Sequence, residues 1–190
     1  MGYYHQSLQV LDFLMACNII AICGNHEAYL LNRLTCSSEA QHLLFIDDLK
    51  KNISPKHIEW LSRLPLSWDT MENNRHIAAF HGSPWNPLQE YIYPDSKKID
   101  SFANFPWDYI LLGHTHYPML KKVGKRVIIN PGSCGQPRDG DPRASAAILD
   151  TGSGQIDFLK EDYDIAKFVQ DARKHGVPPE SLKFFAGREP

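Results

Sequence analysis

Four short apolar runs in the sequence each lead into a glycine that lies close to histidine, asparagine or serine. The runs are IIAIC before GNHE (residues 24–27), IAAF before HGS (81–83), YILL before GHTH (113–116) and VIIN before PGS (131–133). Short aliphatic runs bounded by turn residues predict buried β-strands. In layered α/β folds, ligands bind beyond the ends of the strands. This feature therefore predicts an α/β fold with a functional site at its strand ends.

The first third of the chain predicts mainly helices. Leucines at helical spacing predict a helix over residues 6–17, and NIIAIC (18–23) reads as a short buried strand. Residues 27–64 predict a compact helical segment. Within it, Ser38 to Gln41 matches a capping box, and Ser54-Pro55 pairs an N-cap residue with proline at the first helical position.

The remainder of the chain is rich in predicted strands. Residues 65–160 contain seven short strand candidates separated by turn signals, with one helix expected near residues 96–104. Residues 164–190 predict C-terminal helices, the first of them capped by Asp164. We therefore expect residues 1–190 to form a single layered α/β domain with two sheets.

Composition and charge argue against two classes of partner, nucleic acid and membranes. It has 190 residues, of which 43% are hydrophobic and 22% charged, and its formal net charge is −2. This suits one globular domain, and the charge gives no general electrostatic footprint for nucleic acid. No apolar run approaches the roughly 20 residues needed to cross a bilayer, and the first ten residues lack the plan of a secretory signal. We expect neither general nucleic-acid binding nor a membrane partner.

The cysteines indicate a reducing compartment. Cys17, Cys23, Cys36 and Cys134 are scattered and form no CxxC pair, and two of them lie inside apolar runs. We interpret them as small core residues of a cytoplasmic protein.

Four of the nine histidines follow the strand candidates, namely His26, His81, His114 and His116. Neutral imidazole is the commonest metal ligand among side chains. A lone histidine at a strand end is more often a hydrogen-bonded surface or core residue, and NPGS alone reads as a turn. The four motifs in this order are much more specific than any one of them.

The order GNHE, HGSP, GHTH, NPGS resembles that of the calcineurin-like metallophosphoesterases, and most closely the small bacterial and archaeal phosphodiesterase-type members. The resemblance implies a four-layer αββα sandwich with two divalent metal ions at the strand ends. It implies that Asn25, His81 and His114 bind one metal and that His116 binds the other. On the same pattern, His26 faces the substrate phosphate and helps to stabilise or protonate the leaving oxygen.

The implied reaction is hydrolysis of a phosphomonoester or phosphodiester by metal-bound hydroxide. The metals neutralise and orient the ester and lower the pKa of a bound water, while a general acid assists the leaving group. Mixed nitrogen and oxygen ligands favour manganese, iron, nickel or zinc over calcium. Arg138 is a candidate to clamp a phosphate oxygen, although a solvated loop arginine is the simpler interpretation. Glu27 and Ser83 are weaker candidates for groups near the substrate.

The same resemblance also shows what the sequence lacks. The family normally opens with Asp-x-His and then Gly-Asp at the ends of its first two strands, and neither motif precedes GNHE in this sequence. The sequence therefore resembles a domain without its N-terminal βαβ unit. We expect fewer or weakly bound metals, and an exposed sheet edge that pairs with a second copy of the chain. A truncated enzyme, a shortened protein completed by a partner, and a non-catalytic descendant all remain open.

Two further functional hypotheses accompany the phosphoesterase. One is a non-catalytic interaction or scaffold protein of the same fold, as in the retromer subunit that resembles these enzymes. The other is a regulatory metal or nucleotide sensor. For an enzyme, we expect the substrate to be a phosphate-ester small molecule or a nucleotide, and the sequence does not choose among such esters.

Overall fold

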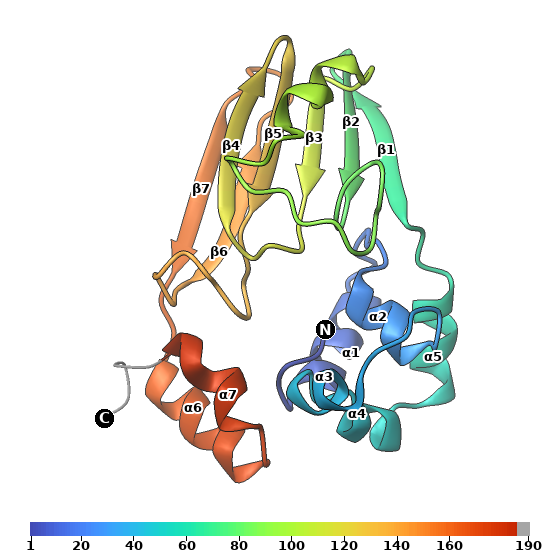
Figure 1. The fold of residues 1–190 in the computed structure, drawn as a ribbon, viewed down its shortest axis with the longest axis vertical. Helices are drawn as coiled ribbons and strands as arrows, with labels where there is room; N and C mark the ends of the chain where they lie inside the picture. The colour runs from blue at the N-terminus through green and yellow to red at the C-terminus, as the bar shows by residue number, and fades with distance from the viewer. Residues whose placement is uncertain (186–190) are drawn as a thin grey trace. The chain divides into compact units, whose positions relative to one another are not determined.

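The computed structural model describes residues 1–185, which fall into two compact units. Residues 1–65 and the stretch that begins at residue 164 form a helical unit. Residues 66–163 form a β-rich unit that contains every strand of the described chain (Figure 1). No helix within residues 1–185 is long and apolar enough to cross a bilayer.

The helical unit has two apolar clusters. One cluster buries Leu11, Ile46 and Leu61. The other joins the two ends of the chain, because Tyr4 packs with Val169 and other residues of the C-terminal segment. The elements are α1 (Ser7–Ala16), α2 (Asn25–Leu30), α3 (Ser38–Leu43), α4 (Ile46–Asn52), α5 (Pro55–Ser62), α6 (Ile165–Lys174), α7 (Pro179–Leu182) and the short 3-10 helix η2 (Lys183–Phe185).

The predicted helix starts are partly confirmed. Ser54 caps α5 by accepting a hydrogen bond from the His57 N–H, with Pro55 at the first helical position. Ser37, and not Ser38, caps α3, because its hydroxyl accepts from the Ala40 N–H. The capping box predicted from Ser38 is therefore wrong: the N-cap lies one residue earlier, and Ala40 at the third helical position cannot complete a box.

The strand predicted at residues 18–23 is wrong. Within the described structure these residues belong to no strand, and the Ile20 side chain is 68% exposed. Cys23 is buried, and its N–H donates to the Pro65 carbonyl at 2.7 Å. A strand needs a neighbour to pair its backbone groups, and no strand of residues 1–185 pairs with this segment.

The interpretation of the cysteines as core residues holds only in part. Cys23 is buried and Cys36 is half-buried. Cys17, at the C-terminal end of α1, and Cys134, in the loop after β5 (Arg126–Pro131), are exposed. Burial of Cys17, which was inferred from its position in an apolar run, is therefore wrong.

All seven predicted strands of the β-rich unit are confirmed. One sheet has the order β1-β2-β3-β5-β4, and a two-stranded sheet pairs β6 with β7. The helix expected near residues 96–104 is the 3-10 helix η1 (Ile99–Asn104). The strands are β1 (Ser67–Glu72), β2 (Arg75–Phe80), β3 (Tyr109–Leu112), β4 (Pro118–Val123), β5 (Arg126–Pro131), β6 (Ala144–Leu149) and β7 (Ile156–Glu161).

Side-chain alternation gives the larger sheet two apolar faces. Ile110 and its same-face neighbours pack against Ile99 and Phe102 of η1. On the other face, Tyr109 lies in a cluster with residues of β6 and β7 such as Phe158. The fold is therefore mixed α/β, as predicted, and the two facing sheets of the expected sandwich lie within this unit.

The register of the central strands determines where their carboxyl ends lie. β2 is parallel to β3 with Phe80 opposite Leu112, and β3 is parallel to β5 with Leu111 opposite Ile129. Parallel neighbours end at the same edge of a sheet, and ligands bind at that edge in open α/β sheets. The residues that follow β2, β3 and β5 are therefore brought together.

Candidate metal and phosphate site

Two predicted ligands meet at this edge of the sheet. His81 directly follows β2, and His114 follows β3 after one glycine. Nε2 of His81 and Nδ1 of His114 are hydrogen-bonded at 3.0 Å, so one nitrogen donates and the other accepts. The structure thus confirms that the two imidazoles are neighbours, which their spacing of 33 residues in the sequence does not reveal.

The other ring nitrogen of His114 is buried without a partner. His114 is 7% exposed, and its Nε2 has no hydrogen-bond partner within the described part of the chain. Burial lowers the pKa of His114 to about 4, and the charge of Arg138 acts in the same direction while the Gln89 carbonyl opposes it. His114 is therefore neutral at pH 7, the state in which imidazole binds a metal.

The backbone of the GHTH loop is held in an uncommon conformation. His114 and His116 both have positive φ, 62° and 58° respectively. Residues other than glycine occupy this left-handed region at a cost, and such residues concentrate at functional sites. The surrounding structure must therefore stabilise the loop.

Asn130 supplies much of that stabilisation. Its side chain is fully buried, and its Nδ2 donates to the Gly113 carbonyl at 2.7 Å and to the Thr115 hydroxyl at 3.0 Å. Its Oδ1 accepts from the Gly132 N–H at 3.0 Å. Asn130 therefore braces the GHTH loop, a role that the interpretation of NPGS as a turn missed. The position of Asn130 at the end of a buried strand was the available signal.

Gln136, which the sequence did not single out, connects His116 with Arg138. Nδ1 of His116 donates to the Gln136 carbonyl at 2.9 Å, and this bond fixes the tautomer in which Nε2 carries the lone pair. The Gln136 side chain is buried, and its Oε1 accepts from Nη2 of Arg138 at 2.9 Å. The Arg138 N–H in turn donates to the His116 carbonyl at 3.0 Å.

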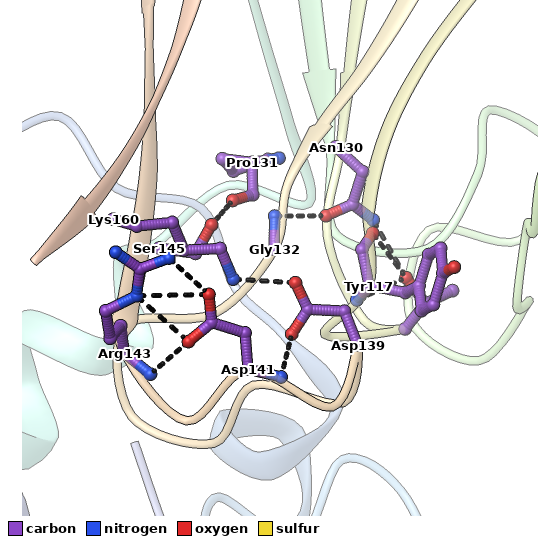
Figure 2. A network of polar contacts seen from close by, with 10 residues as sticks. Tyr117, Asn130, Pro131, Gly132, Asp139, Asp141, Arg143, Ser145 and Lys160 are labelled. Carbon is purple, nitrogen blue, oxygen red and sulfur yellow. Dashed lines mark hydrogen bonds and ion pairs between the residues drawn. The ribbon is translucent and has the colours of Figure 1, made fainter.

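Polar contacts connect the loop between β5 and β6 with the neighbouring strands (Figure 2). The Ser145 hydroxyl donates to the Pro131 carbonyl at 2.6 Å. Asp139 forms an ion pair with Lys160 of β7 at 2.6 Å, and Asp141 forms one with Arg143 at 2.7 Å. These contacts position the half-buried Arg138 next to the GHTH loop, so the arginine is more than a solvated loop residue.

Ser83 acts as a loop brace. It is fully buried, its hydroxyl donates to the Glu90 carboxylate, and it accepts from the Asn86 N–H at 3.0 Å. Gly82 is equally constrained, since a Cβ there would lie 2.6 Å from the Asn86 carbonyl oxygen. Ser83 has no surface with which to contact a substrate, and its suggested role near the substrate is therefore not supported.

Asn25 and His26 belong to the helical unit, where they begin α2. Asn25 is 7% exposed. Nδ1 of His26 donates to the Met1 carbonyl at 2.6 Å. Glu27 accepts from the Gly24 N–H at 2.8 Å, the capping role expected of a glutamate at a helix start. The ligand and acid roles of Asn25 and His26 remain predictions.

The residues of the β-rich unit fit part of a metal site. The buried Nε2 atom of His114, the adjacent His81 and the oriented ring of His116 are suitable nitrogen donors. Within residues 1–185, however, no three His, Cys, Asp or Glu side chains are grouped closely enough to hold a metal ion.

The profile of the calcineurin-like phosphoesterase superfamily domain matches residues 4–154. The chain belongs to this superfamily. Its members are phosphoester hydrolases that generally bind divalent metals. His81, His114, His116 and Arg138 all lie within the matched range, as do Asn25 and His26.

Individual relatives agree with this membership. The chain is 26% identical to a metallophosphoesterase from Sphaerobacter thermophilus, and the two structures align over 98% of this chain and 84% of the other with a TM-score of 0.82. The hypothetical protein PH1004 from Pyrococcus horikoshii has the same fold, with a TM-score of 0.78 at 19% identity over 96% of this chain and 80% of that one. The uncharacterized protein MJ0912 from Methanocaldococcus jannaschii is 27% identical over 93% of this chain and 79% of its own length.

Proposed function

We propose that the protein is a metal-dependent phosphoesterase whose divalent ion is bound by His81 and His114. The observation that carries this proposal is the buried Nε2 of His114, which has no partner within the described residues and belongs to a ring that is neutral at pH 7. A buried polar atom without a partner costs about 1–3 kcal/mol. A bound metal removes that cost.

The remaining residues of the edge suit the recognition of phosphate. The guanidinium of Arg138 donates to Oε1 of Gln136, and a planar guanidinium is the group that suits an anionic phosphate oxygen. His116, whose ring is oriented by the Gln136 carbonyl, is the ligand that we propose for a second cation. When bound, a divalent metal supplies charge neutralisation and a more acidic water. The side chains of the protein orient the phosphate ester.

Metal titration tests the proposal directly. The wild-type protein is titrated with manganese in a calorimeter, and His114→Ala is expected to weaken binding by at least about tenfold, because loss even of an outer partner costs this much. His42→Ala, which removes an exposed imidazole from α3, is the matched control and leaves binding unchanged. Unaltered manganese binding in His114→Ala overturns the assignment.

Turnover tests the reaction class. We expect manganese-dependent hydrolysis of bis(p-nitrophenyl) phosphate by the wild-type protein, with strong loss in His81→Ala and His114→Ala. Absence of turnover with manganese, iron, nickel and zinc would favour the scaffold hypothesis instead.

The predicted role of His26 as general acid is tested by comparing the hydrolysis rates of esters with different leaving groups. An acid contributes typically about 10²–10⁴-fold, and it matters most when the leaving oxygen is basic. His26→Ala is therefore expected to slow hydrolysis of an alkyl phosphate ester much more than that of a p-nitrophenyl ester. Equal losses for both esters would contradict the acid role. Asn25→Ala tests the predicted ligand role by the same manganese titration.

A further inference from the structure

A short extended stretch of the β-rich unit displays two tyrosines to solvent. In the sequence Tyr91-Ile92-Tyr93 the side chains alternate, so that Ile92 is buried in the core while Tyr91 is 48% and Tyr93 38% exposed. The two tyrosine rings are nearly parallel, with planes 6° apart and centroids separated by 6.3 Å. Both rings therefore face the same side of the stretch.

The stretch is anchored at both ends. Glu90 forms an ion pair with Lys98 at 2.5 Å and accepts a hydrogen bond from the buried Ser83. The Tyr93 N–H donates to the Ser96 hydroxyl at 2.8 Å. Together with the buried Ile92, these contacts fix the backbone before any ligand arrives, which lowers the entropic cost of binding.

The exposed rings are continuous with the candidate metal site. The Tyr91 ring stacks on the imidazole of His114, with centroids 3.8 Å apart and planes 27° apart. Tyr117, which is 39% exposed, directly follows the GHTH motif, and its ring lies edge-on to that of Tyr93 at 6.4 Å. We call Tyr91, Tyr93 and Tyr117 the tyrosine platform.

Tyr117 is held as firmly as the other two. Its N–H donates to the Thr115 hydroxyl at 3.2 Å, and that hydroxyl accepts in turn from Asn130 (Figure 2). The brace that holds the backbone of the GHTH loop thus also holds one end of the tyrosine platform. Hydrogen bonds and ring contacts thus connect the platform with the GHTH loop.

Three exposed, immobilised aromatic rings suit a planar ligand. Planar rings stack on tyrosine faces irrespective of their detailed hydrogen bonding, because every base or aryl group has a π-face. A phosphate group held by Arg138 and by a metal ion at His114 would place the substituent of the ester beside the Tyr91 ring. We propose that the tyrosine platform binds a planar aromatic ring carried by the phosphate ester, with nucleobase-containing esters as the preferred class. This inference rests on the proposed function for the position of the phosphate.

Equilibrium binding with three probes tests the platform. Adenosine 5′-monophosphate, phenyl phosphate and ribose 5-phosphate share a phosphate and differ in the ring, and their dissociation constants are measured by calorimetry with manganese present. Stacking on aromatic side chains corresponds to roughly 5- to 150-fold in affinity per base. We expect adenosine 5′-monophosphate to bind more tightly than ribose 5-phosphate by a factor in this range, and phenyl phosphate to fall between them.

Variants assign the preference to the platform. Tyr93→Ala and Tyr117→Ala should each reduce the ratio of the two dissociation constants toward one, whereas Tyr93→Phe, which keeps the ring, should preserve it. The control is Met71→Ala, which removes an exposed apolar side chain from β1; Met71 pairs with His76, near the start of β2 and away from the end that leads to His81. A ratio near one in the wild-type protein, or a ratio that survives both alanine variants, overturns the proposal. Ring-dependent binding without turnover of any ester would refute the proposed reaction while leaving the platform intact.

Discussion

The β-rich unit and the helical unit hold their histidines in different ways. His114 follows β3, which has hydrogen-bonded neighbours on both sides, and its backbone is braced by Asn130. His26 follows an apolar segment of similar composition that has no strand neighbour in the described structure, and it lies at the start of the six-residue helix α2. Neighbouring strands, rather than the local motif, therefore determine whether an apolar run becomes a strand and where the residue after it lies.

The largest expected difference is between the stability costs of two isoleucine truncations, one in β3 and one in the apolar segment before His26. Ile110 of β3 is fully buried, so Ile110→Ala is expected to cost about 2–5 kcal/mol of unfolding free energy through lost burial and a residual cavity. Ile20 is 68% exposed, and Ile20→Ala should change stability by no more than about 0.5 kcal/mol. Urea denaturation measures both. A large cost for Ile20→Ala would show that the segment is buried in solution and would contradict the stated difference between the two apolar runs.

Loss of the Asn130 brace should come next in size. Asn130→Ala leaves the Gly113 carbonyl and the Thr115 hydroxyl without their present donor and releases the left-handed backbone of the GHTH loop. We expect a cost of about 1–3 kcal/mol, together with weaker manganese binding. Denaturation and calorimetric titration are the two measurements. Full stability with normal manganese affinity would mean that the loop keeps its conformation without Asn130.

The Gln136 contacts predict a smaller loss, which is measured here in turnover. Gln136→Ala keeps the carbonyl that orients His116 but removes the acceptor that positions the Arg138 guanidinium. We expect phosphodiester turnover to fall by about 10–100-fold, the usual effect of removing a supporting hydrogen bond. Gln155→Ala, in the turn before β7, is the matched control. A loss that disappears in the Arg138→Ala background would show that Gln136 acts through Arg138.

The smallest expected effect concerns pH. Burial raises the pKa of Glu90, but the hydrogen bonds from Lys98 and Ser83 outweigh it and hold the pKa below the ordinary value of 4.5. Because the folded pKa is the lower one, the carboxylate stabilises the fold above about pH 4.5, and this contribution disappears as the pH falls through the folded pKa.

Thermal melts between pH 7 and pH 3 test this dependence, with Glu90→Gln expected to lose stability less steeply on acidification than the wild type. Glu59→Gln removes the same charge from an exposed ion pair of the helical unit, which contributes little. Parallel melting curves for wild type and Glu90→Gln would contradict the prediction.

Much of the β-rich unit could be predicted from local sequence. Short strand candidates separated by turn residues matched all seven strands. The strand β3 is a continuous apolar run, whereas β7 alternates half-buried with exposed residues. The grouping of His81 with His114 was predicted from the family resemblance, and the structure accounts for it because both residues follow parallel strands that end at one edge. The same rule failed at residues 18–23, where the composition suits a strand but no neighbour is present.

The supporting residues could not be predicted in this way. Asn130 reaches back 17 residues to Gly113, and Gln136 joins His116 across 20 residues. The stack of Tyr91 on His114 likewise joins two loops that are separate in the sequence. Such contacts depend on how loops fold over the sheet edge, and no periodicity in the sequence encodes them.

The sequence alone was enough to predict the seven strands of the β-rich unit, the superfamily and the candidate histidines. These follow from strand patterns and short motifs, which are local properties. The packing of distant segments is needed to show that Nε2 of His114 is buried without a partner among residues 1–185, that Asn130 braces the strained loop, and that the Tyr91 ring borders the site. The physical reason is that hydrogen-bond partners and ring stacking are set by the packing of distant segments.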